Sequence, residues 1–291
     1  MRLSKITLIT NSGYPIPLNK VTFWGFIRDV NGLGFEVDTT YKKIDNEYIL
    51  LNRSYNQMQI KGTIDFNFKD TGVSIMTPQQ AYEDFVRYIT DTPLKIEYQP
   101  VPFTNQVYYR DGEITEVNFD ETKTKKVDIT FTTTGLWYKK NYYRSSSEPV
   151  SDDRKVYDYT YNFRYGGKGQ RNTIELLINT YIPSHFKLIA SGSLVNPVWT
   201  YYNSGEYVAS GKLNYTIPEG YKLVIDTSTK PYGLYMINNN GEYIQNLYNY
   251  SDFSTKRFFD LKEGIGEIVI SDDYNNTSEM LAEVYETYAS V

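Results

Sequence analysis

Apolar and polar residues alternate at every second position over much of this 291-residue chain, and this pattern constrains the fold more than any other feature. The alternation is strict at residues 64–68 (IDFNF), 127–131 (VDITF) and 94–98 (LKIEY). A period of two places the apolar side chains on one face of a β-strand, so each segment is predicted to be a half-buried strand. The continuous run Leu223-Val224-Ile225 instead predicts a strand that is covered on both faces. The fold class is therefore expected to be mainly β.

Turn-forming residues separate these strands. Asn31-Gly32, Pro218-Glu219-Gly220 and residues 238–241 (NNNG) combine glycine with asparagine or proline, as tight turns do. Asp111-Gly112 has the same chemistry, so residues 107–114 (VYYRDGEI) are predicted to form a hairpin around it.

One segment has helical rather than strand periodicity. Residues 77–89 (TPQQAYEDFVRYI) begin with Thr77, a good N-cap, and with Pro78 in the first helical position. Ala81, Phe85, Tyr88 and Ile89 then follow the 3.6-residue period, and a proline at position 93 prevents continuation. One short helix laid against strands is expected here.

The likeliest domain boundary is a polar segment that lacks periodicity. We expect a first domain at residues 1–144, a linker at residues 145–157 and a second domain at residues 158–291. The division also separates charge: residues 1–144 hold 18 basic and 17 acidic residues, whereas residues 145–291 hold 12 and 18. Short strands at regular spacing in the second part predict a β-sandwich or jelly roll.

Composition excludes several function classes. The chain has no cysteine and one histidine, so disulfides, thiolate metal sites, cysteine nucleophiles and poly-histidine sites are ruled out. A net charge of −5 argues against a general nucleic-acid binder. No apolar run approaches the ~18 residues of a membrane span, and the alternating amino terminus is unlike a signal peptide. We expect no enzymatic activity, no cofactor and no metal.

The few candidate chemical motifs favour ordinary structural roles. Residues 166–170 (GGKGQ) lack the Ser or Thr that follows lysine in a phosphate-binding loop, so a flexible turn is expected. Ser184 and His185 are adjacent on a predicted strand and would point to opposite faces. The acidic pairs at residues 152–153 and 272–273 lack the spacing of a calcium loop or of glycosidase carboxylates and are expected in solvated turns.

Tyrosine is unusually abundant, with 30 residues. Trp199, Tyr201 and Tyr202 are the candidate aromatic surface of the second domain, where further tyrosines also gather. Exposed aromatic rings could stack on sugars, whereas the alternative is that these rings form the core and a protein interface. We favour core and interface over a sugar site. The other tyrosines of this group are Tyr232, Tyr235, Tyr243, Tyr248 and Tyr250.

The order of short motifs along the chain resembles that of the distal tail proteins of siphophages that infect Gram-positive bacteria. The resemblance covers nearly the whole chain, although each motif alone is weak. The motifs are residues 32–35 (GLGF), 62–66 (GTIDF), 88–89 (YI), 108–112 (YYRDG), 132–139 (TTTGLWYK), 196–199 (NPVW), 223–226 (LVID), 258–264 (FFDLKEG) and 268–270 (IVI).

This resemblance implies an architecture and a role. It implies an amino-terminal belt domain that forms a hexameric ring and a carboxy-terminal galectin-like β-sandwich outside the ring. The ring would join the tail tube protein to the tail-tip protein and serve as the baseplate hub for receptor-binding proteins. Such a protein is a virion component at the tail tip, made in the host cytoplasm. Tyr108, Tyr109 and Arg110 are the candidate ring contacts.

Two other functions remain open. A carbohydrate-binding module that recognises host wall polysaccharide through Trp199 and the tyrosine group is the second hypothesis. The chain has no room for the extra carbohydrate-binding insertion of longer family members, which argues against direct glycan binding. A tail-borne glycoside hydrolase is the third hypothesis, although the sequence offers no convincing acid and base.

Overall fold

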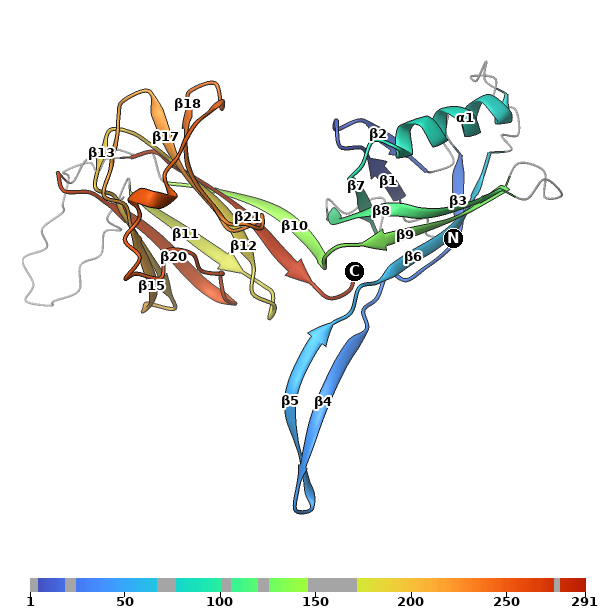
Figure 1. Ribbon diagram of the computed structural model, residues 1–291, viewed down its shortest axis with the longest axis horizontal. Helices are drawn as coiled ribbons and strands as arrows, with labels where there is room; N and C mark the ends of the chain where they lie inside the picture. Colours follow the sequence, from blue (N-terminus) through green and yellow to red (C-terminus); the bar gives the residue numbers. More distant parts are fainter. Residues whose placement is uncertain are drawn as a thin grey trace, which may run out of the picture. The chain divides into compact units, whose positions relative to one another are not determined.

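The computed structural model divides the chain into two compact units (Figure 1). Unit 1 contains Met1–Lys139 and Tyr288–Val291, and unit 2 contains Lys140–Thr287. The structure describes residues 5–18, 25–66, 77–100, 106–119, 126–145, 172–274 and 278–291. Apart from Ser145, the expected linker lies outside the described residues, as do the glycine-rich segment 166–170 and the acidic pair 152–153.

Unit 1 is built on an antiparallel sheet whose strands follow the predicted alternation. The segment at residues 94–98 is confirmed as strand β7, whose residues are alternately buried and partly exposed. Strand β9 carries the pattern at residues 127–131. Strand β6 contains residues 64 and 65 of the pattern at residues 64–68, and residues 67 and 68 lie outside the described residues. Ile64, Phe66 and the apolar residues of β9 are buried in the same core. The order is β2-β1-β7-β8-β9-β6-β3: Pro15–Pro17, Lys5–Ile9, Leu94–Gln99, Tyr108–Phe119, Lys126–Thr133, Gln59–Asp65 and Phe26–Asn31.

The helix is where its capping signals predicted it. Helix α1 spans Pro78–Ile89, and its N-cap Thr77 forms a reciprocal capping box with Gln80. The Gln80 backbone N–H donates to Thr77 Oγ1 at 3.3 Å, and the Thr77 backbone N–H donates to Gln80 Oε1 at 2.9 Å. Phe85 and Ala81 are fully buried, and the Phe85 ring contacts Phe66 edge-on at 5.6 Å. The helix therefore closes the core of unit 1.

The predicted hairpin at Asp111-Gly112 is wrong. Both residues lie inside the continuous strand β8, where Asp111 pairs with Lys95 and Gly112 pairs with Leu94 of β7. A Cβ on Gly112 would lie 2.3 Å from the Thr132 carbonyl oxygen. This glycine is needed because a neighbouring strand approaches closely, and not because the chain turns.

Unit 2 is a β-sandwich. One sheet has the order β19-β18-β17-β12-β21-β10 and the other has the order β11-β20-β14-β15, and residues of both contribute to a single core (Figure 1). Leu223, Val224 and Ile225 of β17 are all fully buried, as their continuous apolar run predicted. The strands of the two sheets are Tyr243–Asn246, Gly233–Asn238, Tyr221–Asp226, His185–Ser191, Met280–Tyr288 and Trp137–Arg144, and then Thr173–Ile178, Gly264–Ser271, Val198–Asn203 and Glu206–Lys212.

Five further elements of the described residues lie outside these two units' main sheets. Strands β13 (Leu194–Val195) and β16 (Thr216–Ile217) form a short ladder, and the 3-10 helix η1 spans Tyr248–Tyr250 in unit 2. In unit 1, β4 (Val37–Ile44) and β5 (Glu47–Tyr55) form a separate two-stranded sheet. None of the helices in the described parts of the chain is long and apolar enough to cross a membrane.

Candidate interaction surfaces

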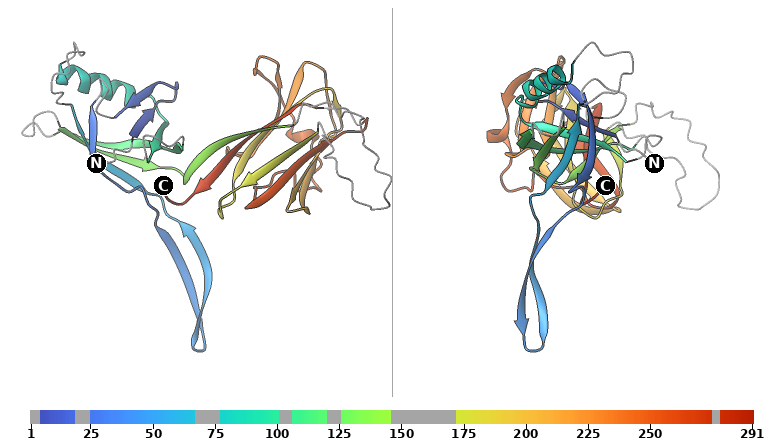
Figure 2. Two further views of the ribbon diagram at one scale, coloured as in Figure 1. Left: turned by 180° about the vertical axis from the view of Figure 1, so that it is seen from behind. Right: turned by 90° about the vertical axis from the view of Figure 1, so that its right-hand side faces the viewer.

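The β4–β5 ribbon projects from the rest of unit 1 as an isolated antiparallel hairpin (Figures 1 and 2). Its pairing runs from Val37–Tyr55 to Ile44–Glu47, and Asp45, with a φ of 54°, begins the two-residue turn. Apart from the partly buried Val37, every residue of the two strands is exposed. A two-stranded hairpin is marginally stable in water by itself, so this ribbon needs further contacts.

The ribbon also exposes large apolar side chains on both of its faces. The consecutive residues Tyr48, Ile49, Leu50 and Leu51 of β5 are exposed by 68%, 46%, 49% and 60%. Because successive side chains of a strand point to opposite faces, both faces of the ribbon are apolar at residues 48–51. Tyr41 and Ile44 of β4 add to these surfaces. Contiguous exposed apolar surface of this kind marks a protein contact site.

The predictions made from the sequence did not include this ribbon. Its signal was present, because a turn-compatible Asp45-Asn46 pair separates two segments rich in β-branched and aromatic residues. The sequence could not show that the apolar run 48–51 would be exposed, since such a run is equally typical of a strand buried on both faces.

The three candidate ring contacts have different surroundings. Tyr108 is partly exposed and meets the Tyr288 ring edge-on at 5.3 Å. Tyr109 is also partly exposed and stacks on Tyr138 at 5.8 Å. Arg110 is fully buried, so its proposed role as an exposed ring contact is wrong. Strand parity separates Tyr109 from Arg110, which point to opposite faces of β8. Tyr108 shares the face of Arg110 and packs against the core of unit 1 at its edge.

The guanidinium of Arg110 is held within the core of unit 1. Its Nε donates a 2.8 Å hydrogen bond to the Gly135 carbonyl oxygen, and its charged carbon lies 5.5 Å from the Trp137 ring centroid. Nη1 and Nη2 have no hydrogen-bond partner among the described residues. Burial lowers the pKa of Arg110 to about 10, so the group is still a cation at neutral pH. Its role is structural.

The predicted aromatic surface at Trp199 and Tyr201 is wrong, because both side chains are fully buried in the core of unit 2. Trp199 Nε1 donates to the Arg257 carbonyl oxygen at 2.8 Å, and the Tyr201 ring stacks on Phe259 at 5.2 Å. Burial also raises the pKa of Tyr201. Tyr202 points the other way and is partly exposed. These rings form the core, which was the favoured alternative.

The adjacent Ser184 and His185 do not form a nucleophile–base pair. His185 Nδ1 lies 2.9 Å from Asp260 Oδ1, whereas the buried Ser184 Oγ accepts from the Thr287 backbone N–H at 3.3 Å. The two side chains therefore have separate partners, as expected for neighbours on a strand.

The acidic pair at residues 272–273 forms hydrogen bonds with a distant segment at β13. Asp272 is buried, so the expected solvated turn is wrong for this residue, whereas Asp273 is exposed. Asp272 Oδ2 accepts from the Val195 backbone N–H at 3.1 Å, and Asp273 Oδ2 accepts from Asn196 Nδ2 at 2.6 Å. Across the described ranges, no group of three or more His, Asp or Glu side chains is arranged to hold a metal ion.

Two comparisons with known proteins found matches, one to a family model and one to solved structures. Residues 5–134 match the family model of the distal tail protein, N-terminal domain. No curated protein matches the chain by sequence. Among solved structures, two chains from the phage P2 baseplate in its activated conformation, one with Ca and one with Sr, are 17% and 18% identical. Each gives a TM-score of 0.66 and covers 99% of this chain and 100% of its own.

A third structure extends the likeness. The SPP1 Dit protein, described as a paradigm of the hub adsorption apparatus in phages that infect Gram-positive bacteria, is 12% identical, with a TM-score of 0.58. The match covers 96% of this chain and 98% of that protein. At these identities the likeness establishes a shared fold across both units.

Proposed function

Through residues 5–134 this chain belongs to the distal tail protein family, and we propose that it is a structural component of a phage tail tip that assembles into a ring. The proposed ring contains six copies and serves as the baseplate hub. It joins the tail tube protein to the tail-tip protein and holds receptor-binding proteins, without catalytic residues. The β4–β5 ribbon is the observation that carries this proposal.

The ribbon supports contact with a second copy of the chain. The ribbon lies inside the segment that matches the family, so the protein that covers it should be a partner common to family members. A closed ring gives every subunit two neighbours through one repeated heterologous contact. A ribbon with apolar side chains on both faces suits this arrangement, because adjoining subunits could cover the two faces and both strand edges.

Unit 2 supports the second half of the proposal. Its two-sheet sandwich has the layered architecture that a galectin-like domain requires, and we assign it to the outside of the ring. Tyr108 and Tyr109 remain proposed ring contacts because both are partly exposed. Arg110 is no longer among them.

The ring can be tested on the full chain by size-exclusion chromatography with light scattering over a range of concentrations. We expect the wild type to form a discrete oligomer of six chains. Two double variants remove one face of the ribbon each: Tyr48→Ser with Leu50→Ser, and Ile49→Ser with Leu51→Ser. Each should shift the protein towards monomer while the melting temperature of the monomer stays close to that of the wild type.

A matched control uses Leu177→Ser with Ile265→Ser in unit 2. These two residues are directly paired across β11 and β20, and they are exposed by 52% and 67%. They present a similar apolar area outside the ribbon, so this variant should assemble as the wild type does. A wild type that stays monomeric at high concentration, or ribbon variants that assemble normally, would contradict the proposal.

The position in the virion needs a separate measurement. Electron micrographs of purified tails, with this protein located by a bound antibody fragment, should place it where the tube meets the tail tip. Label along the tube or on the fibres would count against the hub.

A further inference from the structure

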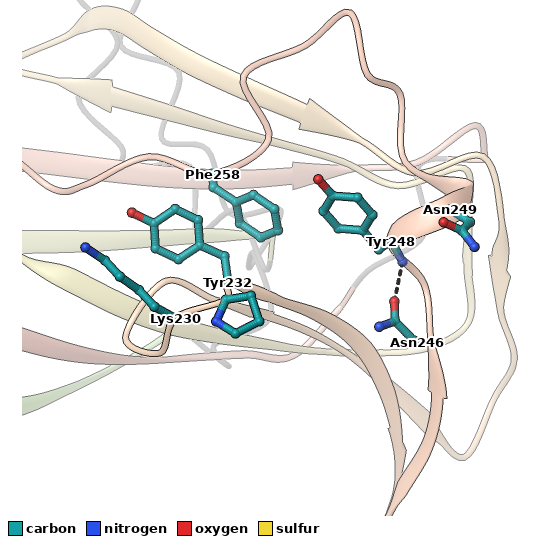
Figure 3. Close-up of a pocket in the computed structure, with 7 residues that line it drawn as sticks. Lys230, Tyr232, Asn246, Tyr248, Asn249 and Phe258 are labelled. Carbon is teal, nitrogen blue, oxygen red and sulfur yellow. Dashed lines mark hydrogen bonds between the residues drawn. The ribbon is translucent and has the colours of Figure 1, made fainter.

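Unit 2 contains a wide cleft lined by aromatic rings and amides, which we call the aromatic cleft. Its volume is about 820 Å³, which is within the range of ligand-binding pockets. Three segments meet there: the turn before β18, the end of β19 with η1, and the chain after η1. The lining of the cleft includes Lys230, Tyr232, Asn246, Tyr248, Asn249 and Phe258 (Figure 3).

The three rings of the cleft form a row. The Tyr232 and Phe258 centroids are 5.2 Å apart with their planes tilted by 41° to each other, and the Phe258 and Tyr248 centroids are 6.4 Å apart with planes 15° from parallel. Figure 3 shows the rings side by side, without overlap. Tyr232 and Tyr248 are exposed by 37% and 38%. The row therefore presents ring faces as a platform to an incoming ligand.

Arg257 fixes this platform before any ligand arrives. Its Nη2 donates a 2.8 Å hydrogen bond to the Tyr248 hydroxyl, and its guanidinium carbon lies 4.7 Å from the Tyr248 ring centroid and 4.3 Å from that of Phe253. The Tyr248 backbone N–H also donates to Asn246 Oδ1 at 2.8 Å. A rigid platform loses little conformational entropy on binding, which favours affinity.

The rim of the cleft can form hydrogen bonds with a neutral, hydroxyl-rich ligand. The Asn246 and Asn249 amides and the Lys230 ammonium are exposed at the rim, and amides both donate and accept. None of the lining residues is acidic, so an anionic substituent on the ligand would meet no repulsion within the lining.

We propose that the aromatic cleft binds a saccharide chain, whose sugar rings stack on Tyr232, Phe258 and Tyr248 while its hydroxyls bond to the amides of the rim. A pyranose ring has an apolar face of C–H groups and a polar edge of hydroxyls, and the platform and rim match these two parts. Proline-rich peptides also dock in aromatic-lined grooves, but the amides and the ammonium of the rim match the many hydroxyls of a saccharide better than they match apolar proline rings.

This inference does not depend on ring assembly, because every residue of the cleft lies in unit 2. It keeps Tyr232 and Tyr248 from the tyrosine group of the second hypothesis and replaces Trp199 and Tyr201, which are in the core. Trp199 supports this region from the core, because its Nε1 donates to the Arg257 carbonyl oxygen.

The test is a titration of the full chain with oligosaccharides of glucose, N-acetylglucosamine and rhamnose that contain three or more units. Saturation-transfer NMR identifies the bound sugar, and calorimetry measures its affinity. We expect saturable binding to at least one of the probes. Tyr232→Ala and Tyr248→Ala should each weaken it at least about fivefold, since aromatic anchors dominate such contacts.

Two further variants make the result specific. Tyr248→Phe keeps the ring and removes the hydroxyl, so it should weaken binding less than Tyr248→Ala. Tyr181→Ala removes a tyrosine that is 90% exposed elsewhere in unit 2 and should bind as the wild type does. The proposal is overturned if no saccharide of the panel binds, if alanine variants with an unchanged melting temperature bind normally, or if a proline-rich peptide binds and saccharides do not.

Discussion

The indole of Trp199 fills the space in which a side chain on Gly211 would begin. A Cβ placed on Gly211 would lie 2.4 Å from Cε2 and Cζ2 of that indole, and the two residues are directly paired across β14 and β15. Trp199 is fully buried, so the ring has little room to move. The core of unit 2 therefore depends on the absence of a side chain at this position.

Gly211→Ala should lower the free energy of unfolding of unit 2 by about 1–3 kcal/mol, because the added methyl overpacks a rigid core. Chemical denaturation followed by tryptophan fluorescence measures the change. Ser210→Ala on the same strand is the control and should change the unfolding free energy by less than about 0.5 kcal/mol. A normal stability for Gly211→Ala would show that the indole has an alternative position.

Two variants of Arg110 separate the free-energy cost of burying its charge from the stabilisation that its packing contributes. Arg110→Ala should destabilise the chain by about 2–5 kcal/mol, because a large side chain is deleted from the core. Arg110→Met keeps much of the side-chain volume and removes the charge, so its cost should stay below about 1 kcal/mol. Urea unfolding at neutral pH compares the two variants. Equal losses would mean that the hydrogen bond to the Gly135 carbonyl outweighs the burial of the charge.

The same variants predict a pH dependence. Burial lowers the pKa of Arg110 from its ordinary value to about 10, so the unfolded chain holds this proton more tightly than the folded chain does. The free-energy cost of the buried charge is greatest below the pKa that Arg110 has in the folded chain, and it declines as the pH rises above that pKa. The stability of the wild type relative to Arg110→Met should therefore increase with pH in that alkaline window.

Asp91 should stabilise unit 1 in a pH-dependent way. The Ser12 hydroxyl and backbone N–H donate to its Oδ2 at 2.7 Å and 3.0 Å, and these hydrogen bonds lower the pKa of Asp91 from 3.8. The contribution is present above pH 3.8 and is lost as the pH falls through the folded pKa. Carboxyl NMR titration should show the pKa of Asp91 returning towards 3.8 in Ser12→Ala. An unchanged pKa would disprove the role of Ser12.

The β4–β5 ribbon should change its hydrogen exchange on assembly. In dilute monomer its amides should exchange far faster than those of β6 and β9, because the ribbon has no burial beyond its own pairing. In the assembled ring, exchange should slow throughout residues 37–55. Hydrogen exchange with mass spectrometry at low and high protein concentration measures the difference. Fast exchange in a proven oligomer would place the ribbon outside the interface.

Local patterns were sufficient to predict several of the elements. The alternation at residues 94–98 and 127–131 became strands β7 and β9, because a period of two allows only one apolar face. The Thr77 cap and Pro78 located helix α1 for a similarly local reason, since both act within one turn. The order of motifs along the chain also indicated the resemblance to distal tail proteins, and residues 5–134 match the N-terminal domain of that family.

Contacts between distant segments decided the rest. The alternation of side chains along a strand places Trp199 and Tyr201 on one face of β14. That face is buried because the second sheet of the sandwich packs against it. Gly112 has turn chemistry, yet Thr132, which is close only in the folded chain, makes it a strand residue.

The two proposed interaction surfaces show the same limit. The apolar run 48–51 has the pattern of a buried strand, and it is exposed because no described segment of unit 1 covers it. The aromatic cleft joins Tyr232, Tyr248 and Phe258, whose segments meet only when β17, β18 and β19 pair. By itself, the sequence determined local conformation and family, because these depend on neighbouring residues. Burial and exposure depend on which segments pack together, so only the tertiary structure could decide them.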